Sequence, residues 1–281
     1  MLTLPITLAV LFAALLHAAW NALVKRGADP LVELALVTLG ASVIALPLLP
    51  LVPFPPAAAW PFLLASVLIH VGYYATLVGT YRHADLSVGY PLMRGSAPLL
   101  VTLAGVLFFG EHPAPATWVG IVLICGGVIS LSAAGGPQPR GVRRRAVGYA
   151  LANAALIAAY TLVDAAGARA SGTAVGYVLW MFFLEGLQFA AFLAWRSRRA
   201  FAGALRARWP VALAGGACSA VSYGIAVWAM TVAPVGAVSA LRECSVVFAL
   251  ALSAWLLKEP IGPRRWIGVA AVLAGAINLR I

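Results

Sequence analysis

Ionisable and aromatic side chains stand inside long apolar segments of this chain. His17 and Asn21 lie four residues apart with Trp20 between them, and His70 and Tyr74 have the same spacing. Residues four apart share one face of a helix, so each pair would present its polar groups to one side. Such groups, converging from several helices, could line one cavity. The candidates for substrate binding are His17, Trp20, Asn21, His70, Tyr74, Tyr90, Arg94, Tyr160, Trp180, Glu185, Tyr223, Arg242 and Glu243.

These residues also have structural explanations. His17 and His70 could form hydrogen bonds between neighbouring helices. The tyrosines and tryptophans could belong to aromatic belts at the membrane surface, and Asp164 could be solvated because it lies near the end of an apolar segment. Glu185 lies near the middle of its segment. A charge there costs about 3 kcal/mol or more unless it faces protein or water, which favours a functional role for Glu185.

The composition places the chain in a membrane. Of its 281 residues, 63% are hydrophobic and 10% are charged, whereas soluble domains carry about 25% charged residues. The apolar runs are continuous and close to the roughly 20 residues that a transmembrane helix requires. Strands of a β-barrel would instead be about ten residues long and alternate in polarity. The sequence therefore predicts an all-α membrane protein.

Prolines, glycines and charges divide the chain into ten apolar segments. They are residues 4–24, 31–51, 60–81, 87–109, 116–134, 146–167, 174–195, 209–232, 236–257 and 266–279. The longest connections are the Arg-rich stretches 135–145 and 196–208, which are too short to form folded domains.

The two halves of the chain are related by an internal repeat. A shift of 148 residues superimposes Arg94 on Arg242 without a gap. Each half then contains five segments: residues 1–135 and 146–281, joined by a basic cytoplasmic connection at 136–145. Because five is odd, the copies cross the membrane in opposite directions. We therefore predict ten transmembrane helices arranged as two inverted five-helix repeats. The same shift superimposes Glu111 on Glu259, Trp118 on Trp266, Gly120 on Gly268 and Gly127 on Gly275.

The equivalent arginines, Arg94 and Arg242, lie about seven residues into the fourth and ninth segments. Inversion would place them at opposite leaflets, each roughly 10 Å inside the membrane. There they could bind a carboxylate bidentately, or they could snorkel to the surface or form structural ion pairs. Glu243 directly follows Arg242 and could neutralise it or carry a proton.

Two further features predict structural roles. Glu111 and Glu259 end the fourth and ninth segments, where an acidic side chain is favourable only with a partner. We expect them to anchor a turn or to cap the next helix. The glycines at 120, 127, 268 and 275 should allow the fifth and tenth helices to pack closely.

The basic residues predict the orientation. Fifteen of the 19 Lys and Arg residues lie in the odd-numbered connections. By the positive-inside rule these connections are cytoplasmic, and both termini lie on the outer, periplasmic side. The net charge of +11 therefore reflects topology and does not predict a nucleic-acid partner.

The chain lacks the HExxH, GxSxG and GxxxxGK[ST] patterns that would indicate a metalloprotease, a serine hydrolase or a phosphate-binding loop. We predict no cofactor and no bound metal, and we keep an intramembrane enzyme only as a remote alternative.

The stretches YPLMRGSAPLLVTLAGVLFFGE (90–111) and SALRECSVVFALALSAWLLKEP (239–260) resemble the paired EamA-type repeats of the drug/metabolite transporter superfamily. The resemblance covers essentially the whole chain. It implies a ten-helix carrier of the inner membrane that works by alternating access around a central cavity, often as an exporter of amino acids or related metabolites.

We therefore expect a transporter that exports amino acids or similar small metabolites, either facilitated or proton-coupled. The alternatives are efflux of amphipathic drugs and flipping of a lipid-linked sugar. The expected partners are a small-molecule substrate and the lipid bilayer. A monomer should suffice, because one chain supplies both inverted halves.

Overall fold

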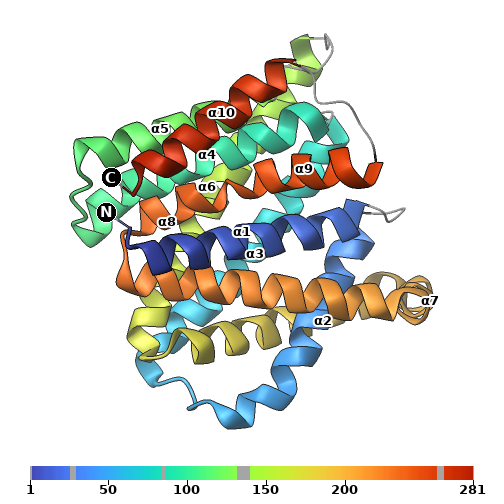
Figure 1. Cartoon of the computed structure of the whole chain (residues 1–281). Coiled ribbons are helices and arrows are strands. Elements are labelled where there is room, and N and C mark those ends of the chain that lie inside the picture. Colours follow the sequence, from blue (N-terminus) through green and yellow to red (C-terminus); the bar gives the residue numbers. More distant parts are fainter. Residues whose placement is uncertain (1, 26–29, 84–85, 132–139, 258–262, 281) are drawn as a thin grey trace.

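The computed structural model describes residues 2–25, 30–83, 86–131, 140–257 and 263–280. The regular structure in these ranges is helical (Figure 1). The helices are α1 Leu4–Lys25, α2 Pro30–Leu48, α3 Trp60–His83, α4 Leu86–Phe109, α5 Pro115–Ser130, α6 Arg140–Ser171, α7 Ala174–Val232, α8 Val235–Arg242, α9 Ser245–Leu257 and α10 Pro263–Asn278, with the short 3-10 turns η1 Leu49–Leu51 and η2 Ala57–Ala59 between α2 and α3.

The described helices confirm the membrane fold. Eight stretches are long and apolar enough to cross a bilayer, and α5 and α10 are shorter apolar helices. Leu8, Leu68 and Leu107 are more than half exposed, as expected where side chains face lipid rather than water. Both termini lie at the same end of the helix bundle (Figure 1), and the Leu2 amide donates a hydrogen bond to the Leu279 carbonyl at 3.4 Å.

Helix α7 contains two predicted segments and folds back on itself. Phe182 and Tyr223 are 41 positions apart, which would separate them by about 60 Å in a straight helix. Their ring centroids are only 6.1 Å apart, and the two limbs of α7 run antiparallel in Figure 1. The connection at 196–208 that the sequence predicts between two apolar segments is itself helical and belongs to α7. This stretch is rich in Arg and Ala, which are strong helix formers.

Two other boundaries also differ from the sequence prediction. Helix α6 begins at Arg140 instead of Ala146, so the end of the predicted basic connection is helical. The predicted ninth segment is interrupted at Glu243 and Cys244, between α8 and α9. The amide of Glu243 donates to the carbonyl of Ala240 at 2.9 Å. This three-residue spacing replaces the four-residue spacing of an α-helix and tightens the backbone there.

The contact between α5 and α10 shows how the two repeats are related. A Cβ atom on Gly127 would lie 2.7 Å from the carbonyl oxygen of Gly268, and one on Gly275 would lie 2.6 Å from that of Gly120. Sequence equivalence pairs Gly120 with Gly268 and Gly127 with Gly275, so equivalent glycines exchange partners across the contact. That exchange is the mark of a two-fold axis between antiparallel helices, which is the symmetry of an inverted repeat. The prediction that these glycines allow close packing is confirmed.

Polar contacts join the two repeats at both ends of the bundle. At one end, Arg208 Nε lies 2.9 Å from Oε1 of the buried Glu33 at the start of α2. At the other end, the Val235 amide at the start of α8 donates to Glu111 Oε1 at 2.8 Å. Glu111 therefore caps a helix, as expected, but the helix is α8 of the second repeat and not the next helix along the chain. Glu259 lies outside the described residues.

The glycine contact predicts an unequal response at two neighbouring positions of α5. Gly127→Ala should destabilise the protein by about 1–3 kcal/mol, because the new methyl group meets the backbone of α10. Gly126→Ala is the matched control, since a Cβ atom at Gly126 has nothing within 4 Å. Thermal unfolding of both variants in the same detergent measures the difference. Equal melting temperatures would show that the α5–α10 contact is looser than described.

Candidate functional site

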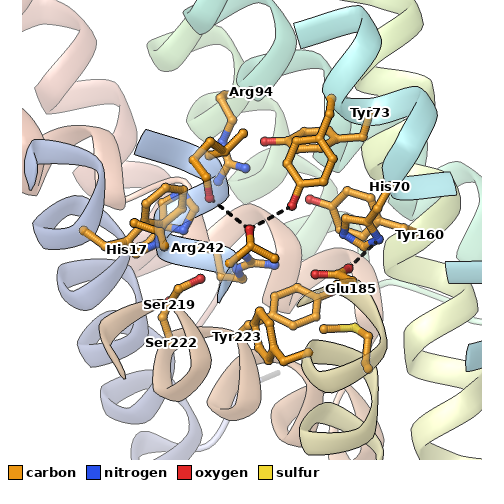
Figure 2. A pocket seen from close by; sticks show the side chains of 17 residues that line it. His17, His70, Tyr73, Arg94, Tyr160, Glu185, Ser219, Ser222, Tyr223 and Arg242 are labelled. Carbon is orange, nitrogen blue, oxygen red and sulfur yellow. Dashed lines mark hydrogen bonds and ion pairs between the residues drawn. The ribbon is translucent and has the colours of Figure 1, made fainter. Parts of the chain in front are cut away.

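A small cavity of about 80 Å³ lies among α1, α2, α3, α4, α6, α7 and α8. Figure 2 shows the side chains that converge on it from these helices. Its lining consists of His17, Trp20, Leu34, Val37, Thr38, His70, Tyr73, Tyr74, Arg94, Tyr160, Met181, Phe182, Glu185, Ser219, Ser222, Tyr223 and Arg242. Side chains from both repeats therefore meet in one site.

Nine of the residues proposed from the sequence line this cavity. They are His17, Trp20, His70, Tyr74, Arg94, Tyr160, Glu185, Tyr223 and Arg242. The two arginines, expected near opposite leaflets, thus face the same space. They reach it because α4 and α8 both pass through the centre of the bundle, and every residue of α8 is buried.

Four other candidates are not part of the lining. The Asn21 side-chain amide donates to the His17 carbonyl of its own helix at 2.8 Å. Trp180 packs against Trp60, with ring centroids 6.0 Å apart. Tyr90 packs in a separate apolar cluster that includes Met93. Glu243 lies outside the lining and interacts with a residue that belongs to it.

The partner of Glu243 is Arg94 of the other repeat. Arg94 Nε donates to Glu243 Oε2 at 3.0 Å, and Arg94 Nη2 lies 2.8 Å from Glu243 Oε1. Only the Nε contact has full hydrogen-bond geometry, because Nη2 has no well-aligned acceptor among the residues that the structure describes. The carboxylate of Glu243 therefore compensates the positive charge of Arg94 in the first repeat, and not that of the adjacent Arg242.

Arg242 faces an aromatic ring. Its guanidinium carbon lies 5.3 Å from the centroid of the Tyr223 ring, a distance at which the ring attracts the cation. Within the described part of the chain, Arg242 has no ion-pair partner. The side chain is 7% exposed, so its charge is directed into the cavity and not into the surrounding solvent.

Acidic groups occupy a different wall. His70 Nδ1 lies 3.0 Å from Glu185 Oε1 and 2.9 Å from the Ser66 carbonyl oxygen. The Ser66 contact is a hydrogen bond. The Glu185 contact is an ion-pair distance, and no described residue meets Glu185 Oε1 with hydrogen-bond geometry. Glu185 is 2% exposed. Glu185 therefore lines the cavity with its Oε1 atom buried next to the His70 ring.

Asp164 lies behind the same wall. Its side chain is fully buried and accepts hydrogen bonds from the hydroxyl of Tyr177, at 2.9 Å, and from that of Tyr223. The interpretation of Asp164 as a solvated residue is therefore wrong. Helix α6 continues to Ser171, and both limbs of α7 cover the position that the sequence suggested was near a helix end.

Aromatic rings connect the two walls. The His70 ring stacks on Tyr160 with centroids 4.4 Å apart, and the Tyr160 ring lies 6.3 Å from that of Tyr223. Tyr223 contacts Asp164 through its hydroxyl and Arg242 through its ring face. Tyr160 and Tyr223 thus link His70, beside Glu185, to Arg242 within one site (Figure 2).

Several lining residues were absent from the sequence-based candidates. Thr38 is the clearest case: its hydroxyl lies 3.5 Å from that of Tyr74 and donates to the Leu34 carbonyl at 3.0 Å. Thr38 is a small polar residue in an apolar segment, so the sequence only weakly indicates that it lines a cavity. Ser219 and Ser222, by contrast, belong to the same predicted segment as Tyr223, whose polar groups the sequence suggested could line a cavity. Both line it, and Ser222 donates to the Ala13 carbonyl at 2.7 Å. Apolar lining residues such as Met181 carry no signal at all.

Comparison with known proteins identifies the family. The EamA-like transporter family matches this chain twice, over residues 4–133 and 144–280. A protein of Bacillus subtilis (strain 168), described as the uncharacterized membrane protein YvaE, is 40% identical over 53 residues, which is 19% of this chain and 44% of that protein. The match thus spans less than half the length of that relative.

A solved crystal structure shares the fold. It covers 98% of this chain and 96% of its own chain, with a TM-score of 0.76 and 17% identity. At that identity the likeness concerns the fold alone. The two family matches together span nearly all of the described helices, and this chain belongs to the EamA-like transporter family.

Proposed function

We propose that this transporter exports amino acids or related small zwitterionic metabolites by alternating access. The observation that carries the proposal is the placement of opposite charges on two walls of one small cavity. Arg242 supplies a cation without an ion-pair partner among the described residues. Glu185 supplies a buried carboxylate whose Oε1 atom lies beside His70 and has no hydrogen-bond partner of good geometry in the described ranges.

The two walls match the two ends of an amino acid. A guanidinium binds a carboxylate through two parallel N–H donors, so Arg242 would bind the carboxylate of the ligand. Glu185 would accept hydrogen bonds from its ammonium group. A buried charge that lacks a partner is costly. Among the described residues Arg242 has no ion-pair partner and Glu185 has only the His70 ring beside it, so a zwitterion would compensate both side chains at once. The aromatic rings between them would contact the body of the ligand.

The size of the cavity supports a small ligand. A drug-sized molecule occupies a pocket of about 300–1,000 Å³, whereas this cavity measures about 80 Å³ in the present conformation. That volume suits a few water molecules or a compact metabolite. It favours an amino acid over the two alternatives, an amphipathic drug and a lipid-linked sugar.

The contacts between repeats support alternating access. Glu33 and Arg208 join the repeats at one end of the bundle, and Glu111 and α8 join them at the other. Each contact is polar and can be exchanged for water at low net cost. Rocking of one repeat against the other would open one end while the opposite end stays closed.

The central prediction concerns transport by the purified chain in liposomes. Counterflow of a labelled amino-acid panel should occur with wild-type protein, whereas 2-hydroxy acids and primary amines, which each lack one charge, should compete poorly. Arg242→Ala and Glu185→Gln should each lower amino-acid counterflow about tenfold or more, because each removes one charged contact.

Arg145→Ala is the control for this experiment, since Arg145 is exposed at the start of α6, far from the cavity lining. It should transport like the wild type. If no amino acid is exchanged by folded wild-type protein, the proposal is wrong, and amphipathic or lipid-linked substrates become the next panel.

The orientation in the membrane is a second prediction. We infer an inner-membrane location with both termini on the periplasmic side, because the basic connections favour the cytoplasm. Alkaline phosphatase fused after Ile281 should be active, and a fluorescent protein that folds only in the cytoplasm should stay dark at the same position. The reverse pattern of the two reporters would invert the topology.

The third prediction concerns the oligomeric state. We infer that the monomer is the transporting unit, because residues from both repeats of one chain already line the cavity. Native mass measurement of protein in nanodiscs should give one chain, with a mass of 29.2 kDa. A predominant dimer would contradict this inference.

A further inference from the structure

The two repeats differ by one carboxylate beside their equivalent arginines. Arg94 is followed by Gly95 in the first repeat, whereas Arg242 is followed by Glu243 in the second. The only described carboxylate that forms an ion pair with either arginine is therefore contributed by the second repeat, and it binds the arginine of the first. The inverted symmetry of the fold is broken at this point in the site.

Packing explains why the first repeat has no equivalent carboxylate. A Cβ atom on Gly95 would lie 2.5 Å from the Ile129 Cγ1 atom and 3.0 Å from the Cys125 carbonyl oxygen of α5. A glutamate cannot occupy that position without displacing α5. In the second repeat, the interruption between α8 and α9 falls at Glu243, and the side chain leaves the helix axis there to reach Arg94.

The ion pair uses two of the donor nitrogens of the Arg94 guanidinium. Both the Nε and the Nη2 atoms lie within 3.0 Å of the Glu243 carboxylate. Nε and Nη2 lie on one planar edge of the guanidinium, and such an edge can bind a carboxylate through two parallel hydrogen bonds. Arg94 lines the cavity, but this edge of its guanidinium is already used, while Arg242 has no ion-pair partner among the described residues.

We propose that Glu243 determines specificity: by occupying Arg94, it leaves Arg242 as the single carboxylate anchor and restricts the transporter to substrates with one carboxylate. This inference rests on the proposed transport of amino acids. A substrate with a second carboxylate would meet Glu185 on the other wall, where like charges repel. Removing the Glu243 charge would free Arg94 and create a second anion site beside Arg242.

The test compares two ligands that differ in one group. Aspartate and asparagine have nearly the same shape, and only aspartate carries a second carboxylate. With the full chain in liposomes, we measure how strongly each competes with the uptake of labelled asparagine. Glu243→Gln should raise the affinity for aspartate relative to asparagine about tenfold or more, as expected for one new charge-assisted contact.

Two control variants make this result specific. Glu33→Gln also removes a buried carboxylate from an arginine, Arg208, but outside the cavity lining. It should leave the aspartate-to-asparagine ratio unchanged. Arg94→Gln/Glu243→Gln removes both charges of the pair and should keep the wild-type preference, because Arg242 remains the anchor.

The outcomes separate this inference from the proposed function. If wild-type protein takes up no amino acid, the proposed function itself is wrong. If it takes up asparagine but Glu243→Gln leaves the ratio unchanged, only the role of Glu243 is refuted. Should Glu243→Gln fail to fold, the double variant decides: retained asparagine uptake, together with its loss in Arg242→Gln, supports a single anchor. Loss of asparagine uptake in the double variant as well as in Arg242→Gln shows that Arg94 also binds substrate, which contradicts a single anchor.

Discussion

A charged side chain inside the membrane must face a partner or a polar cavity, and the central helices are arranged around this constraint. Arg94, Arg242, Asp164, Glu185 and Glu243 are all buried. Two of them form an ion pair, and Asp164 is held by tyrosine hydroxyls. Arg242 and Glu185 remain directed at the cavity. The cavity is therefore the place where the structure brings together these two buried charged side chains.

Duplication gives the two repeats equivalent helices that pack symmetrically, whereas the charged side chains around the cavity are not arranged symmetrically. The glycines of α5 and α10 pack as a symmetric pair, which is what a structural contact between two related halves requires. The arginines are also equivalent in sequence, but one is compensated by Glu243 and the other faces Tyr223. An asymmetric ligand such as a zwitterion needs this kind of asymmetry, because its two ends carry opposite charges.

The interruption between α8 and α9 lies at Glu243, whose side chain pairs with Arg94 beside the cavity. Glu243 and Cys244 adopt three-residue hydrogen bonding, and the equivalent part of α4 remains one continuous helix. A discontinuous helix at the centre of a transporter is a common way to place polar groups within the membrane. Here the break lies directly after Arg242. The residue at the break, Glu243, is also the one that pairs with Arg94.

The sequence by itself determined the membrane location, the ten apolar segments, the repeat and most polar residues of the cavity. Each of these depends on composition, on spacing along one helix or on the similarity of the two halves of the chain. Tertiary structure decided which charges meet. Glu243 is adjacent to Arg242 in the chain but pairs with Arg94, and the buried Asp164 accepts hydrogen bonds from one tyrosine on each limb of α7. Such contacts join helices that are distant in sequence, and their geometry depends on how the helices pack.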